Sequence, residues 1–249
     1  MNTVSKLECW KKTALGTPIS LYSSRPLTEL MAERPILLFG GVHGDEPEGV
    51  HLAENTLTAL TEWSKSEALV PWILIPCLNV DGFIAKTRVN GRGVDLNRNY
   101  PSKDWTPTVK LDDPKKDTAR YNPGPSPMSE PEVAGIVELI ETHKPRLLIH
   151  CHSWEPCIVA TGESSGIDGM RLTPQPAEHL AQSSSYKLVP EIGYPTPGSL
   201  SRYGWFEKGI PVICIEEQEN LLDFSTIWPR FSQGMHAIFK TQSSHRGAP

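Results

Sequence analysis

The sequence predicts an α/β protein with three layers, in which helices cover both faces of a mixed, mostly parallel central sheet. Short apolar runs at 35–39, 70–78 and 210–216 have the length of buried strands. An amphipathic segment at 47–63, with apolar residues near helical spacing, separates the first two runs. A strand, a helix and a second strand in this order are typical of a parallel sheet.

The length and composition suit a soluble globular protein with one domain. The 249 residues fit a single α/β domain, which we expect over 1–241, with a disordered tail at 242–249. A net charge of −5 with no basic cluster argues against a nucleic-acid partner. No run of about 18 apolar residues is present, so no membrane span is predicted. The first twelve residues have no apolar core, so no secretory signal is expected.

The five cysteines are odd in number, and none is spaced Cys-x-x-Cys. This pattern favours reduced, buried thiols and therefore a cytoplasmic protein. It also argues against a zinc site built from thiolates. The cysteines stand at positions 9, 77, 151, 157 and 214.

The first part of the chain reads as an entry unit at 1–34, with strands around 7–10 and 19–22. The strand at 35–39 then leads into the helix at 47–63. Asp45 stands where an N-cap is expected, with Glu48 three residues on, which is the pattern of a capping box.

The segment from 83 to about 129 has little periodic pattern and many prolines. Nearly fifty residues without clear elements are too many for a passive connection, so a functional loop is predicted. Ser129 and the proline and glutamate that follow it predict the start of a helix over about 130–143. The apolar run at 146–152 predicts the next strand.

The last part of the chain adds elements that complete the α/β pattern. We expect a helix at 174–185, a short strand at 186–190 and a helix at about 199–208. The strand at 210–216 ends on a carboxylate. A final helix is expected over roughly 220–240, interrupted near Pro229.

Three strands of this predicted sheet end in polar side chains that can hold a metal. His43 and Glu46 follow the first strand, His150 and His152 lie at the end of another, and Glu216 ends the last. Ligands of open α/β sheets bind at the carboxyl ends of the strands. A catalytic zinc commonly takes three protein ligands, two of them close in sequence. The sequence therefore predicts one Zn²⁺ held by His43, Glu46 and a histidine of 150–152.

Each of these residues has an alternative interpretation. His43 can be an incidental histidine beside a capped helix. Positions 150 and 152 project from the same face of a strand, so periodicity does not choose between them. His152 is preferred because it is nearer the end of the strand.

A metal-activated water needs a base, and Glu216 follows an almost wholly apolar strand, which is an unusual place for an unpaired carboxylate. Its alternative role is an ion pair with Arg98 or another arginine. Glu217 and Glu219 are expected on a solvated edge.

The motif at 93–99, Gly-Val-Asp-Leu-Asn-Arg-Asn, taken with His43 and Glu46, resembles the zinc carboxypeptidase family of the carboxypeptidase A type. The resemblance implies that Arg98, with Asn97, binds the free α-carboxylate of the substrate. It places Arg88 at the oxyanion-stabilising arginine of the family.

The same resemblance extends towards the end of the chain. His152 followed by Ser153 matches the third-ligand motif and supports His152 over His150. The strand ending at Glu216 matches the one that carries the general base of the family. A mobile tyrosine is implied as well, with Tyr194 as the first candidate and Tyr203 as the second.

Within the family, the motifs at 79–82, 93–99, 124–132 and 193–199 resemble the murein peptide amidase branch. This resemblance implies a zinc-dependent hydrolase that cuts the γ-D-glutamyl–meso-diaminopimelate bond of murein peptides during cell-wall recycling, as a monomer or homodimer. Two alternatives are a zinc amidase that removes an acyl group from an amino acid and a non-catalytic peptide-binding relative. The intact Glu216 argues against the second of these.

Overall fold

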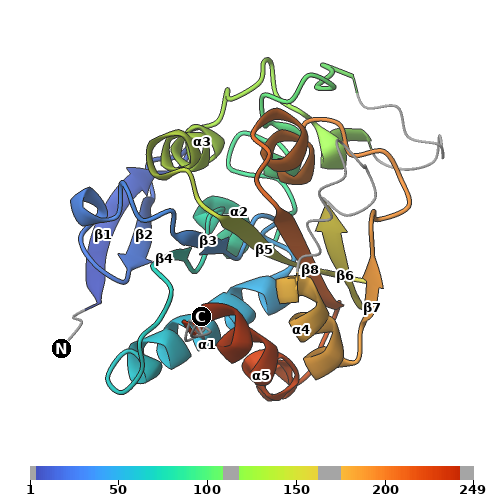
Figure 1. The fold of residues 1–249 in the computed structure, drawn as a ribbon. Helices are drawn as coiled ribbons and strands as arrows, with labels where there is room; N and C mark the ends of the chain where they lie inside the picture. The colour runs from blue at the N-terminus through green and yellow to red at the C-terminus, as the bar shows by residue number, and fades with distance from the viewer. Residues whose placement is uncertain (1–3, 109–117, 162–174, 242–249) are drawn as a thin grey trace.

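The structure is a computed structural model that describes residues 4–108, 118–161 and 175–241. These residues form an eight-stranded sheet in the order β1-β2-β4-β3-β5-β8-β6-β7 (Figure 1). The strands are β1 (Ser5–Lys12), β2 (Pro18–Ser23), β3 (Ile36–Phe39), β4 (Trp72–Ile75), β5 (Leu147–Trp154), β6 (Cys157–Thr161), β7 (Lys187–Val189) and β8 (Val212–Gln218). The α-helices are α1 (Pro47–Trp63), α2 (Val80–Ala85), α3 (Pro131–His143), α4 (Gln175–Ser184) and α5 (Ile227–Phe239).

The centre of the sheet is parallel and its outer parts are mixed. β4, β3, β5 and β8 are parallel neighbours in that order. β1, β2 and β4 pair antiparallel on one side, and β6 pairs antiparallel with β8 on the other. The mixed sheet of the sequence prediction is confirmed. Because β3, β5 and β8 run in the same direction, their carboxyl ends share one edge.

Helices cover both faces of the sheet, so the predicted three-layer α/β/α architecture is also confirmed. Alternate residues of β3 enter different cores: Leu37 and Phe39 join one, and Ile36 and Leu38 join the other. The first core includes α3 and the π-helix Arg202–Glu207, and the second includes α1, α4 and α5. Figure 1 shows α1, α4 and α5 together on one side of the sheet and α3 on the other.

Helix α1 has the predicted bounds, but its predicted N-cap is wrong. Glu46 occupies the N-cap position, and Pro47 begins the helix with the fixed backbone that suits a first turn. Glu48 does not close a capping box. It accepts hydrogen bonds from the Ser153 hydroxyl at 2.7 Å and from the Leu221 amide at 3.0 Å. The carboxylates of Glu46 and Glu48, at the start of α1, therefore do not cap the helix but face the carboxyl edge of the sheet.

Other elements differ from the sequence predictions. Neither α2 nor β6 is predicted from the sequence, because each is a short run beside a turn. The segment expected as a helix at 199–208 holds the π-helix. Helix α5 begins at Ile227, and Pro229 lies in its first turn, where proline is tolerated, so it does not interrupt the helix.

The long segment after α2 folds back over the sheet edge. It contains the 3₁₀ turns Leu96–Arg98 and Thr118–Tyr121. The Asn99 side-chain amide donates to the carbonyls of Pro123 and Ser126 and to the Ser129 hydroxyl, at 2.8–3.0 Å. These bonds tie the segment to the start of α3. The tail expected to be disordered, 242–249, lies outside the described residues.

Candidate active site

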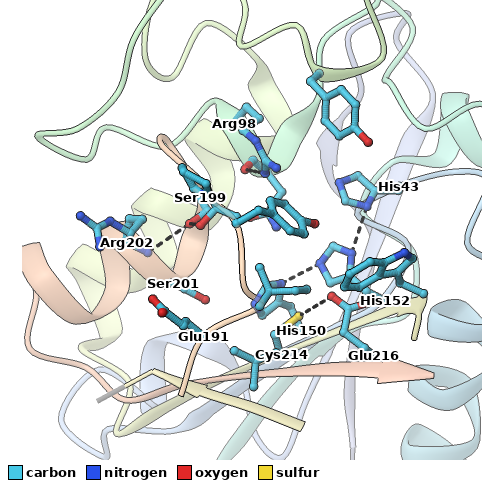
Figure 2. Close-up of a pocket in the computed structure, with 18 of the residues that line it drawn as sticks. His43, Arg98, His150, His152, Glu191, Ser199, Ser201, Arg202, Cys214 and Glu216 are labelled. Carbon is cyan, nitrogen blue, oxygen red and sulfur yellow. Dashed lines mark hydrogen bonds between the residues drawn. The ribbon is translucent and has the colours of Figure 1, made fainter. Parts of the chain in front are cut away.

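A cavity of about 1230 Å³ opens at the carboxyl ends of β3, β5 and β8 (Figure 2). Its walls contain charged groups of both signs and residues from many parts of the chain. The predicted site residues that line it are His43, Glu46, Arg88, Asn97, Arg98, His150, His152, Tyr194 and Glu216. Tyr203, the second candidate for the mobile tyrosine, is not among the residues that line it.

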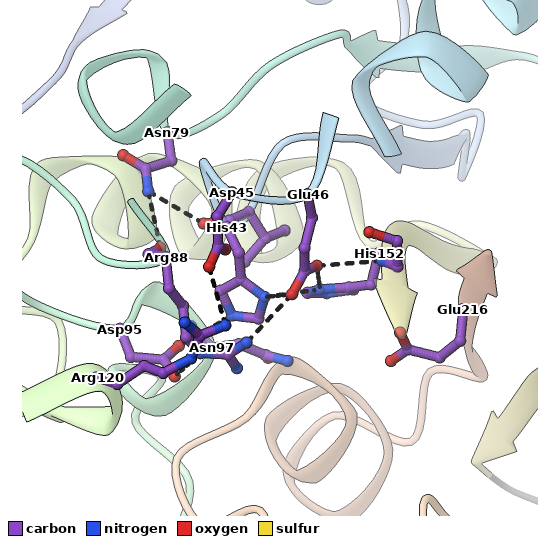
Figure 3. Close-up of polar contacts among 12 residues, drawn as sticks. His43, Asp45, Glu46, Asn79, Arg88, Asp95, Asn97, Arg120, His152 and Glu216 are labelled. Atoms are coloured by element: carbon purple, nitrogen blue, oxygen red, sulfur yellow. Dashed lines mark hydrogen bonds and ion pairs between the residues drawn. The ribbon is translucent and has the colours of Figure 1, made fainter. Parts of the chain in front are cut away.

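His43, Glu46 and His152 bring three ligand atoms together below the surface. Glu46 Oε1 lies 2.8 Å from His43 Nδ1, and Glu46 Oε2 lies 2.8 Å from His152 Nδ1 (Figure 3). The two Nδ1 atoms are 3.0 Å apart. All three residues are buried, and their ligand atoms lie within 4.8 Å of one another. Two imidazoles and a carboxylate converging in this way suit a zinc ion with an open fourth position.

The local backbone explains why His43 and Glu46 meet. His43 lies in the turn after β3, and Glu46 caps α1, so both point over the same edge of the sheet. Gly44, between them, packs directly on the backbone of Gly82 and Phe83, where a Cβ atom would collide. The turn therefore depends on glycine at this position.

The other nitrogen of each histidine contacts a second polar group. His43 Nε2 lies 3.1 Å from Asp95 Oδ1, and His152 Nε2 lies 2.8 Å from His150 Nδ1. Partners of this kind fix the ring and leave Nδ1 for a metal, as in many zinc sites. Burial by itself raises the pKa of Asp95, but Arg88 and His43 outweigh it and hold this pKa well below its ordinary value. Asp95 therefore stays ionised behind His43, and the donor set fits the metal.

His150, His152 and Cys214 form a second buried group whose ligand atoms lie within 4.8 Å of one another. The two groups share His152. Metal binding by cysteine requires the thiolate. Burial and the charge of Glu216 raise the pKa of the Cys214 thiol well above its ordinary value in the metal-free protein. His150 contacts the Nε2 atom of His152 at 2.8 Å, and His152 remains our prediction for the third ligand.

Glu216 faces the same cavity from β8, where it is the register partner of His152 in β5. Burial and the neighbouring charge of Glu46 raise the pKa of Glu216 to about 8. The Cys214 thiol donates to Glu216 Oε1 at 3.3 Å. No ion pair between Glu216 and Arg98 occurs in the described residues. Arg98 instead donates to the Asn97 carbonyl at 2.8 Å.

Arg88, Asn97 and Arg98, three of the predicted site residues, line another part of the cavity. Arg88 donates to Asp95 Oδ2 at 3.0 Å and to Glu46 Oε1 at 3.1 Å. Asn97 Oδ1 accepts the Leu200 amide at 3.0 Å and so anchors the loop after Gly198. The Arg88 and Arg98 guanidinium groups both lie over the Tyr121 ring, at 5.0 and 5.8 Å from its centre. This places three cationic or amide groups beside the proposed metal ligands.

The comparisons with known proteins agree with this geometry. The model of the zinc carboxypeptidase family matches residues 12–205. The chain belongs to this family. The match ends before Glu216, so the base assignment does not rest on it. Members of the family are zinc-dependent peptide hydrolases, and this chain is an enzyme of that class.

Individual relatives point to one branch of the zinc carboxypeptidases. The chain is 29% identical over 201 residues to murein peptide amidase A of Escherichia coli (strain K12), covering 79% of this chain and 75% of that protein. It is 26% identical over 210 residues to murein peptide amidase A of Vibrio campbellii, covering 82% of this chain and 76% of that protein.

Solved structures show the same fold. The murein-tripeptide amidase of Escherichia coli O157 superposes with a TM-score of 0.70 at 23% identity, over 96% of this chain and 94% of that one. Thrombin activatable fibrinolysis inhibitor gives a TM-score of 0.74 at 19% identity, over 95% and 70%. No described helix is long and apolar enough to cross a lipid bilayer.

The structure separates the two candidates for the family's mobile tyrosine. Tyr203 is buried, and its hydroxyl donates to Glu141 of α3 at 2.8 Å. Tyr194 is 41% exposed and lines the cavity, with its ring edge-on to Trp154 at 5.8 Å. Of the two, Tyr194 is the one that lines the cavity.

Some features of the site are not predicted from the sequence. Asp95 stands in the recognised motif, but nothing in its spacing indicates that it contacts His43. Arg120 lies in the segment without periodic pattern and pairs with Asp45 at 2.9 Å. Glu217, expected on a solvated edge, is buried and contacts the Tyr186 hydroxyl. All five cysteines are free, but the prediction of buried thiols is confirmed only for Cys151 and Cys214, since Cys77 and Cys157 are half-buried and Cys9 is exposed.

Proposed function

We propose that this zinc carboxypeptidase hydrolyses the γ-D-glutamyl–meso-diaminopimelate bond of murein peptides, with one zinc ion per chain. The observation that carries the proposal is the convergence of His43, Glu46 and His152 with Glu216 and Arg98 in one cavity. This arrangement combines three metal ligands, a general base and a positively charged side chain that can bind a substrate carboxylate. Together these groups suit the removal of a C-terminal residue from a peptide.

The metal set is His43, Glu46 and His152, with Asp95 and His150 behind the two rings. Zinc in such a site supplies a Lewis acid that polarises a carbonyl and lowers the pKa of a water. The three residues leave the cavity side open for substrate. Arg88, hydrogen-bonded to Glu46 and Asp95, is held in place to donate to the oxygen of the scissile carbonyl.

Glu216 is the proposed general base. It accepts a proton from the attacking water and then donates it to the amine that leaves as the C–N bond breaks. Its raised pKa brings it closer to neutral pH, where both transfers are efficient. Its position in β8, opposite His152, places it on the far side of the metal ligands from Arg88 (Figure 3).

Arg98 and Asn97 are proposed to bind the α-carboxylate next to the bond that is cut. A planar guanidinium can bind a carboxylate through two parallel hydrogen bonds. Tyr194 lies on the loop that borders this part of the cavity and is proposed to cover bound substrate.

The murein substrate is supported by the curated relatives, which carry the name murein peptide amidase A. The cavity also suits a substrate with several charges, since it is lined by Arg88, Arg98, Arg120 and Arg202 together with Glu191. The five free cysteines support our proposal that the enzyme works in the cytoplasm, on small murein peptides.

The test is incubation of zinc-loaded protein with L-Ala-γ-D-Glu-meso-diaminopimelate, followed by mass spectrometry. We expect release of free diaminopimelate, which a chelator abolishes and added zinc restores. Cleavage of ordinary C-terminal residues or of N-acylated amino acids, without this release, would contradict the murein assignment. Inactivity on every substrate would favour a non-catalytic peptide-binding protein.

A further inference from the structure

Beyond the residues already assigned, a further arginine lines the cavity beside the metal ligands. Arg120 comes from the 3₁₀ turn Thr118–Tyr121, and its side chain is 50% exposed. It pairs with Asp45 at 2.9 Å (Figure 3). Asp45 stands in the chain between the proposed ligands His43 and Glu46, so this pair brings a positive charge to the edge of the metal site.

The surroundings of Asp45 show that it does not serve the helix. It is not the N-cap of α1, and its Oδ1 atom is buried without a hydrogen-bond partner in the described part of the chain. A buried acceptor of this kind costs free energy. The ion pair with Arg120 is the contact that the structure gives to this carboxylate. We therefore take Asp45 as the residue that holds Arg120 at the cavity.

The other arginines of the cavity are held differently. Arg88 is 10% exposed and is bound by Asp95 and Glu46, and Arg98 is buried beside the Asn97 carbonyl. Arg202 is paired with Asp104 and belongs to the π-helix. Arg120 combines an exposed side chain with a position next to the metal ligands, which suits direct contact with substrate.

The position of Arg120 also indicates which part of a substrate it meets. Figure 3 shows Arg120 on the same side of His43 as Arg88, with Glu216 beyond His152 on the other side. In the proposed function, the scissile carbonyl oxygen faces Arg88 and the amine leaves towards Glu216. Asn97, beside Arg98 on the proposed leaving side, is anchored to the loop at Leu200. Arg120 is bound instead to Asp45, between the proposed ligands, so we place the acyl part of the substrate beside Arg120.

We propose that Arg120 is a specificity-determining residue that binds a free carboxylate on the acyl side of the scissile bond. This inference rests on the proposed function. An acidic residue linked through its side-chain carboxyl keeps its α-carboxylate free, a few bonds from the scissile carbonyl. A residue in an ordinary α-linked peptide has no carboxylate there. Arg120 would thus favour γ-linked over α-linked peptides through a charge-assisted hydrogen bond.

The test compares two tripeptides that differ only in this group. One is L-Ala-γ-D-Glu-meso-diaminopimelate, and the other carries a carboxamide in place of the free α-carboxylate of glutamate. We would measure kcat/KM for both with the wild-type enzyme, Arg120→Gln and Arg120→Lys. Arg25→Gln is the matched control, since Arg25 forms a half-exposed ion pair with Glu33 at 3.1 Å and does not line the cavity.

The wild-type enzyme and Arg25→Gln should prefer the carboxylate form by about tenfold to a hundredfold. Arg120→Gln should lose this preference through a fall on the carboxylate form alone, and Arg120→Lys should retain part of it. An unchanged ratio in Arg120→Gln, or an equal fall on both tripeptides, would overturn the assignment and leave the proposed function standing. Failure of the wild-type enzyme to cleave either tripeptide would overturn both.

Discussion

Asp95 and His150 are single residues that contact the proposed zinc ligands on the side away from the proposed metal position. Each contacts the Nε2 atom of one proposed zinc ligand, at 3.1 Å for Asp95 and 2.8 Å for His150. Asp95 also binds Arg88, so one carboxylate positions both a ligand and the proposed oxyanion donor. The sequence motif contains Asp95, but only the fold brings it beside a histidine 52 positions earlier.

Replacing Glu216 by glutamine tests the base directly. The change removes the proton acceptor while keeping nearly the same shape, so kcat should fall by a factor of about 10² to 10⁴ or more. Zinc content, measured by mass spectrometry of the metal, should remain one per chain. Glu138→Gln, an exposed glutamate of α3, serves as the control. Turnover at the wild-type rate in Glu216→Gln would refute the assignment.

The same carboxylate predicts the acidic limb of the pH–rate profile. A base must be ionised, and the raised pKa of Glu216 means that it becomes protonated at a higher pH than an ordinary glutamate. We expect kcat/KM to fall with decreasing pH through an apparent pKa above the ordinary value of about 4.3. Zinc beside Glu46 should move this pKa down from its metal-free value. An inflection at or below the ordinary value would count against Glu216.

At the scale of elements, the site depends on the carboxyl ends of the strands and on the loops that pack over them. The strands β3, β5 and β8 can be recognised in the sequence because buried parallel strands form nearly continuous apolar runs. Their shared carboxyl edge follows, and with it the grouping of His43, His152 and Glu216. The contacts between loops cannot be recognised from the sequence in this way. The contact of Asn97 with the Leu200 amide joins segments 103 residues apart, and no periodicity encodes it.

A substitution at Gly198 tests the contact between the loop that contains Arg98 and the loop that contains Leu200. It has a φ of +72°, and a Cβ atom there would collide with the Arg98 carbonyl. Gly198→Ala should push the loop from Arg98 and raise KM for substrates with a free α-carboxylate by about tenfold or more. Gly209→Ala is the matched control. Gly209 has a similar positive φ of +63°, has open space around the Cβ position and does not line the cavity. Equal kinetics in both variants would mean that the contact with Arg98 has no role in substrate binding.

For the whole molecule, the proposed metal would join the turn after β3, the start of α1 and the end of β5 through buried polar side chains. A ligand that binds only the folded state stabilises it, by about 4 kcal/mol at a thousand times its dissociation constant. For a chain of this size, this corresponds to a rise in Tm of roughly 10 °C. The sequence places the predicted ligands at the ends of separate strands, and the structure brings them together across the edge of the sheet.

Thermal unfolding with and without zinc measures this coupling. We expect zinc to raise Tm of the chelated protein by about 10 °C. His152→Ala should abolish the shift, and His236→Ala should keep it, because His236 pairs with Glu67 on the surface of α5, outside the cavity. An undiminished shift in His152→Ala would place the stabilising ion elsewhere.

The most direct measurement is anomalous diffraction at the zinc absorption edge from crystals of the zinc-loaded protein. We predict one strong peak within bonding distance, about 2 Å, of His43 Nδ1, Glu46 and His152 Nδ1, with Glu216 facing it across the cavity. A peak held instead by His150, His152 and Cys214, the second buried group of ligand atoms, would contradict the assignment on which the proposed function is built.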